Sequence, residues 1–450
     1  MDNEMFKYDE RMGELIFDYC RKRLSFDPVT LDFSGEKGAL DAVLAGLMCP
    51  EGNDPERVLQ VFVDHLAPAV ISCDSPRFLA FIPAAPTRAS MLFDMIVSCS
   101  SLQGSSWLEA AGAVAAENQA LRVLADLAGL PSEAGGVFVS GGSAANLSAL
   151  AVARDTAHKS SRRRRRRLRV AVSDQTHSSI RNALRILDME EFVVPTTDHR
   201  LTGDTLRRAL AGDRHRSEVV AVAATAGTTN AGIVDDLAGI ADVAARHDLW
   251  FHVDGAYGGA ALLAPSARHL FTGIERADSF VVDPHKWLFA PFDCAALLYR
   301  DPTLAKAVHS QHASYLDVFH AEPGWNPSDY AYHLTRRARG MALWFSLAVH
   351  GIDAYRTAVE AALTMAHRAA ARIDAADHLE LVREPGLSIV LFRRRGWQAA
   401  DYHRWSRELL ASQVGFVTPT TWQGETTARF AFLHPNTTVE MVDEILATMM

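Results

Sequence analysis

The chain has 450 residues, of which 48% are hydrophobic and 22% are charged, enough for a large core and two or three structural units. Its formal net charge of -9 argues against a nucleic-acid partner and against attraction to a membrane surface. No apolar run reaches the roughly 18 residues that a membrane-spanning helix needs, so we expect no membrane partner.

The predicted elements begin with a helical segment at residues 1–70 and a helix at 109–128, which ends before Gly129 and Pro131. From 137 to 299, short apolar runs alternate with helices of ten or more residues. This alternation indicates βαβ units and a mostly parallel sheet. The expected strands are 137–140, 168–173, 219–225, 249–253, 280–282 and 295–299.

The last third of the chain has a different character. Residues 309–333 contain Pro, Gly, Tyr, His and Asp with little periodicity, which predicts a long loop of the kind that is often functional. Helices are predicted at 336–350 and 353–374. Short strands and further helices follow, so we expect a small C-terminal α/β domain, residues 346–450, beside a large domain of residues 71–345.

Composition also bears on location and on the available chemistry. The five cysteines are scattered, and the start of the chain lacks the basic and apolar segments of a secretory signal. We therefore expect a cytoplasmic protein without a disulfide framework or a metal site. The arginine run Arg162–Arg167 is better interpreted as a solvated connection than as an anion or nucleic-acid patch. The chain has six lysines, so few residues can supply a reactive amine.

Glycines and a hydroxyl follow the first predicted strand. Gly141, Gly142 and Ser143 lie between this strand and a helix, where backbone N–H groups and the positive end of the helix dipole can hold a phosphate. The simpler alternative is a glycine turn with Ser143 as the helix cap. Thr228 follows the strand that ends at Thr225, and it could contact the same ligand or only form a turn.

Two further polar side chains follow predicted strands. His177 could stack its flat imidazole on a planar ring and later move a proton, or it could simply cap a helix. Asp254 ends a buried apolar strand, where a carboxylate needs a partner such as a protonated pyridine nitrogen, unless it caps the next turn. Because parallel strands end at one edge of the sheet, we expect these groups to share a crevice.

The candidate reactive amine belongs to Lys286, which follows an apolar strand and precedes Trp287 and Leu288. A lysine in apolar surroundings tends to lose its proton, and the neutral amine can form an imine. Lys159 also follows a histidine, but it lies beside the arginine run, where a charged and solvated lysine is expected. Together, a phosphate cradle, a stacking group, a partner for a ring nitrogen and an imine lysine predict pyridoxal 5'-phosphate as the cofactor.

The chain resembles the group II pyridoxal-phosphate-dependent amino-acid decarboxylases, the family of aromatic-L-amino-acid decarboxylase, in the blocks SDQTHSS, HVDGAYGG and DPHKWLFAPFDC. The resemblance implies a type I aminotransferase-like α/β fold with a mostly parallel seven-stranded sheet and a small C-terminal domain. It also implies an obligate homodimer with shared active sites, to whose contacts residues 1–70 contribute. The implied roles are ring stacking by His177, pairing with the ring nitrogen by Asp254, packing on the ring by Ala256, and phosphate binding by Ser143 and His285.

The resemblance further implies decarboxylation of an L-amino acid to an amine and carbon dioxide. A site that holds the α-carboxylate perpendicular to the ring plane promotes loss of that group, because the bonding electrons can enter the π system. Return of a proton to the carbon needs an acid. His177 and two residues of the predicted loop, Tyr330 and Tyr332, are the candidate donors.

The predicted substrate pocket departs from the family pattern. Its wall consists of Phe81, Pro83, Ala84, Gln103 and Ser105. Ala84 stands where aromatic decarboxylases tend to carry a hydroxyl, and Ser105 stands where they tend to carry a large aromatic side chain. Both differences change the predicted pocket, so an aromatic amino acid is the substrate that we expect only by default.

Other functions are compatible with the same residues. With the same cofactor, the protein could be an aminotransferase or an oxidative deaminase that forms an aldehyde. Arg429 could bind a carboxylate in the plane of the ring for transamination, or it could be structural. An inactive cofactor-binding scaffold is a further alternative, against which the intact Lys286, Asp254 and His177 count. A nucleic-acid binder would rest on the arginine run alone.

Overall fold

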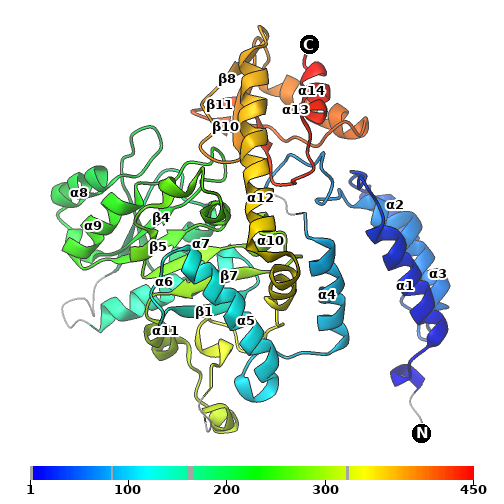
Figure 1. Cartoon of the computed structure of the whole chain (residues 1–450), viewed down its shortest axis with the longest axis horizontal. Coiled ribbons are helices and arrows are strands. Elements are labelled where there is room, and N and C mark those ends of the chain that lie inside the picture. The colour runs from blue at the N-terminus through cyan, green and yellow to red at the C-terminus, as the bar shows by residue number, and fades with distance from the viewer. Residues whose placement is uncertain (1–3, 83–84, 160–166, 321–323) are drawn as a thin grey trace.

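The structure is a computed structural model that describes residues 4–82, 85–159, 167–320 and 324–450. Figure 1 shows a large body built around one sheet, a smaller C-terminal unit at one end, and an N-terminal arm at the side. The long helix α12 (Met341–Asp374) runs from the large body into the C-terminal unit.

The central sheet has seven strands in the order β1-β7-β6-β5-β4-β2-β3. They are β1 (Gly135–Val139), β2 (Arg169–Val172), β3 (Glu190–Val193), β4 (Val219–Thr225), β5 (Trp250–Asp254), β6 (Ser279–Val282) and β7 (Ala295–Tyr299). Among these strands, β7 is antiparallel to both of its neighbours, and the other adjacent strands are parallel. The predicted mostly parallel sheet is confirmed.

Packing on both faces of the sheet explains why its inner strands are buried and mostly apolar. β4 and β5 are buried at every position, as expected of parallel strands covered on two sides. Successive side chains point to opposite faces, so Ala223 and Ala224 belong to two different hydrophobic clusters. The flanking helices are α5 (Trp107–Leu127), α6 (Gly142–His158), α7 (Ser178–Ile186), α8 (Gly203–Gly212), α9 (Leu237–His247) and α11 (Pro302–His309).

Strand β3, which forms one edge of the sheet, is absent from the strands expected from the sequence. This strand begins with Glu190 and Glu191 and is only partly buried. An edge strand has a neighbour on one side only, so it lacks the continuous apolar run that identified the inner strands. The two carboxylates pair with Arg167 and Arg181, at 2.7 and 2.6 Å.

The C-terminal unit holds an antiparallel sheet in the order β10-β11-β9-β8, which confirms the predicted small C-terminal domain. Its elements are β8 (Leu379–Leu381), β9 (Ile389–Arg394), α13 (Ala399–Ala411), β10 (Thr420–Trp422), β11 (Glu425–Ala431) and α14 (Val439–Ala447). The two helices predicted at 336–350 and 353–374 are the two halves of α12, which begins at Met341 and is interrupted between them. It bends at Gly351, whose φ of 75° lies in the left-handed region that glycine adopts readily.

The N-terminal arm consists of α1 (Glu10–Leu24), α2 (Lys37–Leu44) and α3 (Pro55–Val61), and α4 (Arg88–Cys99) follows it beside the body. Arg11 joins α1 to Asp54 and Glu56 at 2.9 and 2.6 Å. The arm also exposes apolar side chains, each by 40–45%: Met12, Ile16, Phe17, Val58 and Phe62. On α4, Leu92 and Ile96 are 50% and 54% exposed.

Candidate active site

A cavity of about 290 Å³ lies at the carboxyl ends of β1, β2, β4, β5 and β6. Most of the predicted cofactor-binding residues line it together: Gly142, Ser143, His177, Asp254, Ala256, His285 and Lys286. This is the arrangement expected when the loops after parallel strands meet at one edge of a sheet.

The glycine turn after β1 leads directly into helix α6. The carboxylate of Asp283, which follows β6, accepts the backbone N–H of Gly142 at 3.1 Å. A Cβ atom at position 142 would lie 3.0 Å from that carboxylate and 3.1 Å from Cβ of Ala256, so a glycine fits this position best. The first turn of α6, with Ser143, therefore faces the cavity and presents the positive end of the helix dipole.

Lys286 lies on the short helix α10 (Pro284–Trp287), immediately after β6. Its Nζ is 3.1 Å from Oδ2 of Asp283, a carboxylate that the sequence analysis did not consider. The apolar neighbours predicted from the sequence, Trp287 and Leu288, are buried in the core. The amine is thus held at the cavity by an anionic partner, while the aromatic and aliphatic side chains anchor the helix that carries it.

His285 is oriented by the backbone. Its Nδ1 accepts the N–H of Cys294 at 3.0 Å, and burial lowers the pKa of the imidazole, so the ring is neutral with its proton on Nε2. The Nε2–H donor is therefore available to an anion in the cavity. This geometry is compatible with the predicted contact to a phosphate.

Asp254 and His177 lie on the same cavity, at the ends of β5 and β2. The Asp254 carboxylate accepts hydrogen bonds from Ala256 N at 3.1 Å and from Asn146 Nδ2 at 2.9 Å. His177 is also the N-cap of α7, because its Nδ1 accepts the N–H of Ser179 at 3.2 Å. His177 therefore caps a helix and lines the cavity at the same time, while its stacking on a ring and its transfer of a proton stay predictions.

Thr228 does not line the cavity. Its hydroxyl accepts the N–H of Ile233 at 3.1 Å and so closes a turn, which was the alternative interpretation of this residue. The neighbouring Thr229 lines the cavity instead. Asn146, Ser179 and Asp283 also line it and were not predicted. A signal for Asn146 was present, because it follows Ser143 by three residues and so shares its helix face.

The described residues of the predicted substrate wall do not line the cavity of their own chain. Pro83 and Ala84 fall outside the described residues, and Phe81, Gln103 and Ser105 do not line the cavity. The Phe81 side chain is 59% exposed, whereas Ser105 is buried. Nε2 of Gln103 donates to Oε1 of Glu109 at 2.9 Å.

The two candidate tyrosines also lie away from the cavity. Tyr330 is buried, with its ring stacked on Trp325 at 4.0 Å, and burial raises its pKa. Tyr332 is 54% exposed, and its backbone N–H donates to Ser148 Oγ at 3.3 Å. Of the arginine run, only Arg167 belongs to the described residues.

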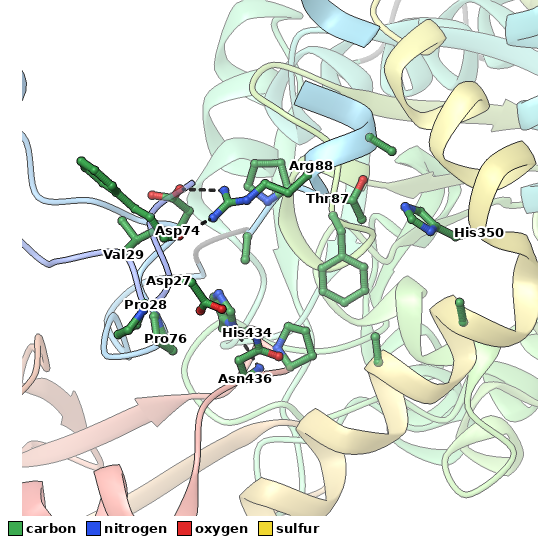
Figure 2. Close-up of a pocket in the computed structure, with 18 of the residues that line it drawn as sticks. Asp27, Pro28, Val29, Asp74, Pro76, Thr87, Arg88, His350, His434 and Asn436 are labelled. Carbon is green, nitrogen blue, oxygen red and sulfur yellow. Dashed lines mark hydrogen bonds and ion pairs between the residues drawn. The ribbon is translucent and has the colours of Figure 1, made fainter. Parts of the chain in front are cut away.

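A larger cavity of about 580 Å³ lies at the base of the N-terminal arm (Figure 2). In it, Arg88 approaches Asp74 at 3.9 Å, and the backbone N–H of Asn436 donates to Nδ1 of His434 at 3.0 Å. None of the predicted cofactor groups lines this second cavity, so it is separate from the candidate active site.

The residues of the smaller cavity fit pyridoxal phosphate. The cofactor requires donors for a phosphate, an anion beside its ring nitrogen, a flat group for its ring and an amine for its aldehyde. Donors for the phosphate are present at the start of α6 and on His285, and the Asp254 carboxylate can serve as the anion. The flat group is the His177 imidazole, and the amine is that of Lys286. One oxygen of Asp283, Oδ1, is buried and has no hydrogen-bond partner within the described part of the chain, so the cavity retains acceptor capacity next to the amine.

A family model described as the pyridoxal-dependent decarboxylase conserved domain matches residues 41–395. The chain belongs to this family. It is 31% identical over 409 residues to an aromatic-L-amino-acid decarboxylase of Bacillus atrophaeus, with 88% of this chain and 85% of the relative covered. It is 28% identical to a phenylacetaldehyde synthase of Petunia hybrida, with 87% and 80% covered.

Solved structures agree with this assignment. The crystal structure of Oryza sativa TDC with PLP and tryptamine matches with a TM-score of 0.89 and 27% identity, and covers 98% of this chain and 97% of that chain. The type I fold, the cofactor and the class of enzyme predicted from the sequence are thereby confirmed: the protein is a pyridoxal-phosphate-dependent decarboxylase. In the described part of the chain, no helix has the length and hydropathy needed to cross a membrane.

Proposed function

We propose that this decarboxylase acts on an L-amino acid, by default an aromatic one, and releases carbon dioxide and the corresponding amine. The observation that carries the proposal is the convergence of Lys286, Asp254 and His177 on one cavity. Several relatives support the default substrate, since they are named aromatic-L-amino-acid, tyrosine and tryptophan decarboxylases.

Each residue then has a distinct task. Lys286 would bind the cofactor through its amine, and the cofactor would supply an electron sink for the pair left on the substrate carbon when carbon dioxide departs. The Asp254 carboxylate, at the floor of the cavity, stabilises a protonated ring nitrogen. His177 covers one face of the ring. The donors at the start of α6 and on His285 hold the phosphate and so fix the ring relative to Lys286.

His177 is the candidate proton donor that faces the cavity in a single chain. Its Nδ1 accepts from the backbone of Ser179, so a neutral ring carries its proton on Nε2. We propose that Nε2 of His177 returns the proton to the substrate carbon. Tyr330 and Tyr332 stay alternative donors, and each would have to approach the cavity by a movement of its segment or from a second chain.

We also propose that the protein is a homodimer with shared active sites and that residues 1–70 contribute to its contacts. The exposed apolar side chains of α1, α3 and α4 support this, because burying them against a second copy would remove them from water. Three residues of the predicted substrate wall, Phe81, Gln103 and Ser105, do not line the cavity of their own chain, which is expected if a partner completes the pocket. Light scattering should give twice the mass of one chain, and removal of residues 1–70 should give an inactive monomer.

An aldehyde-forming reaction is the second candidate, because an aldehyde synthase is among the relatives. Transamination has less support. Arg429 is buried and donates through Nη2 to the carbonyl oxygens of Phe81 and Thr229, both at 2.7 Å, and it does not line the cavity. These contacts favour a structural role for Arg429. Its side chain links β11 of the small domain to two loops near the site.

One experiment separates the candidates. The protein saturated with pyridoxal phosphate is incubated with each common amino acid, and carbon dioxide, amine, aldehyde, hydrogen peroxide and keto acid are measured separately. Equal amounts of amine and carbon dioxide support the proposal. Aldehyde with peroxide, or keto acid without carbon dioxide, contradicts it in favour of the oxidative or transamination reaction. No turnover with any amino acid would support a catalytically inactive scaffold.

The scattered cysteines led us to expect a cytoplasmic protein, and we retain this as a proposal. All five are free thiols in the structure, which is compatible with a reducing compartment. Fractionation of the source cells with an antibody to the chain would test it, and recovery of the protein with a secreted fraction would contradict it.

A further inference from the structure

A continuous set of buried hydrogen bonds connects the Asp254 carboxylate of the candidate active site to helix α6 and to three other residues of the sheet. Trp250 Nε1 donates to Ser279 Oγ at 2.8 Å, and Ser279 Oγ is 2.8 Å from Nδ1 of His252. Nε2 of His252 is 2.9 Å from Oδ1 of Asn146. Asn146, His252 and Ser279 are each at most 1% exposed, so water does not compete for these contacts.

Asn146 is the point at which this set branches. Its Nδ2 donates to Oδ2 of Asp254 at 2.9 Å and to Oγ of Ser179 at 3.0 Å. Ser179 Oγ in turn lies 2.8 Å from Nδ1 of His177. One amide therefore contacts the carboxylate expected at the ring nitrogen and, through a single hydroxyl, the imidazole expected on the ring face.

The chemistry of the partners fixes the direction of every bond. A carboxylate only accepts, so the amide of Asn146 must turn its Nδ2 toward Asp254 and its Oδ1 toward His252. His252 then carries its proton on Nε2, and its Nδ1 accepts from Ser279. Burial lowers the pKa of His252 to about 4, which agrees with a neutral ring that can accept at Nδ1.

The other branch is fixed in the same way. Nδ1 of His177 is an acceptor, since the backbone N–H of Ser179 donates to it at 3.2 Å, so Ser179 Oγ, which accepts from Asn146, can direct its own hydrogen to the same nitrogen. The proton of a neutral His177 is thereby placed on Nε2, the atom to which the proposed function assigns proton return.

We propose that Asn146 is a positioning residue for decarboxylation: its amide holds the Asp254 carboxylate and, through Ser179, the His177 imidazole in the orientations that serve the cofactor ring. This inference rests on the roles that the proposed function gives to Asp254 and His177. Asn146 itself acts on the ring only through these two residues. A packing role alone would require no particular hydrogen-bonding groups at position 146.

Two substitutions distinguish positioning from packing. Asn146→Leu keeps a similar volume and removes both donors and the acceptor. Asn146→Asp keeps the shape and can still accept from His252, but it donates to Asp254 only while the introduced carboxyl is protonated. The titratable groups that face position 146 are Asp254 and His252 from β5 and, through Ser179, His177 from α7. Thr156→Val is the matched control, because its hydroxyl lies buried on the same helix without a partner among the described residues.

The first measurement is cofactor binding, which does not depend on turnover. For Asn146→Leu we expect the dissociation constant of pyridoxal phosphate to rise about tenfold, as for loss of one hydrogen bond to a charged group, together with a changed visible spectrum. For Asn146→Asp we expect affinity near that of the wild type at low pH and a progressive loss as pH rises, because two ionised carboxylates then face each other. Thr156→Val should bind as the wild type does.

The second measurement is steady-state kinetics with whichever amino acid the panel identifies. A positioning role predicts that kcat of Asn146→Leu falls about tenfold or more with little change in KM, because in this role Asn146 acts through Asp254 and His177 and not on the substrate. Wild-type cofactor affinity, spectrum and kcat in Asn146→Leu would overturn the inference. So would an Asn146→Asp variant whose cofactor affinity shows the pH dependence of the wild type. If the panel gives no turnover, the proposed function fails while the binding measurement still decides on Asn146.

Discussion

Asp254→Asn removes one charge from the candidate site and almost no volume. Both carboxylate oxygens of Asp254 accept hydrogen bonds from N–H donors, one from Ala256 and one from Asn146. The NH₂ group of an asparagine at this position would therefore face a donor in either orientation. The substitution combines loss of the anion beside the ring nitrogen with an unfavourable contact behind it, although the two side chains have the same shape.

The expected loss of activity follows from the charge. Two unit charges about 4 Å apart attract by about 4 kcal/mol at an effective dielectric constant of about 20. Asp254 is 6% exposed, so solvent screens this attraction little. Since each 1.36 kcal/mol corresponds to a factor of ten in rate, loss of the attraction in the transition state should lower kcat by about a thousandfold.

The assay is release of carbon dioxide at saturating substrate and cofactor, with the bound cofactor counted from its visible absorbance. Asp254→Glu is the matched control, because it keeps the charge and changes only its reach, and it should lose far less activity than Asp254→Asn or Asp254→Ala. If Asp254→Asn retained more than a tenth of wild-type kcat per bound cofactor, Asp254 would not be the partner of the ring nitrogen.

Other consequences can be measured directly. Lys286→Ala should abolish the visible imine band and turnover, whereas Lys159→Ala should leave both unchanged; a pyridoxyl adduct at another lysine after borohydride reduction would contradict this. Arg336 is buried and forms a bidentate pair with Glu117 at 2.7 and 2.8 Å, so Arg336→Met should lower the free energy of unfolding by about 3–5 kcal/mol in urea titrations. Burial raises the pKa of Asp235 to about 7, so the native state keeps a proton that the unfolded chain loses near pH 4. This carboxyl therefore contributes stability at low pH that is lost as pH rises from about 4 to about 7, so the free energy of unfolding of the wild type, measured relative to that of Asp235→Asn, should fall over this range.

The main elements of the sheet were predictable because parallel strands covered on both faces require continuous apolar runs, as in β4 and β5. The edge strand β3 was not predictable, because its sequence begins with two partly exposed glutamates and so resembles that of a loop. The break in α12 was predictable, because a glycine at position 351 separates two helical stretches, and the backbone leaves the helical conformation at that residue.

The candidate site was predictable where a residue type is rare or chemically specific, as with Lys286 and Asp254. Asn146 and Asp283 were missed, because each acts through a contact between segments more than a hundred residues apart. Thr228 and Thr229 are adjacent and alike in sequence, and only the turn closed by Thr228 decides which of them lines the cavity. The expected roles of Tyr330 and Tyr332 stay predictions, since their surroundings in one chain leave both away from the cavity.

The charged side chains of β3, which made this strand hard to predict, also affect how molecules of this protein behave in concentrated solution. An uncovered strand edge invites hydrogen bonding with the same edge of another molecule, and a row of ion pairs such as Glu190–Arg167 and Glu191–Arg181 opposes that stacking. Acidification, which neutralises the glutamates, or high salt, which screens the pairs, would therefore be expected to promote aggregation through this edge before the core itself unfolds. Storage near neutral pH and at moderate ionic strength follows as the practical choice.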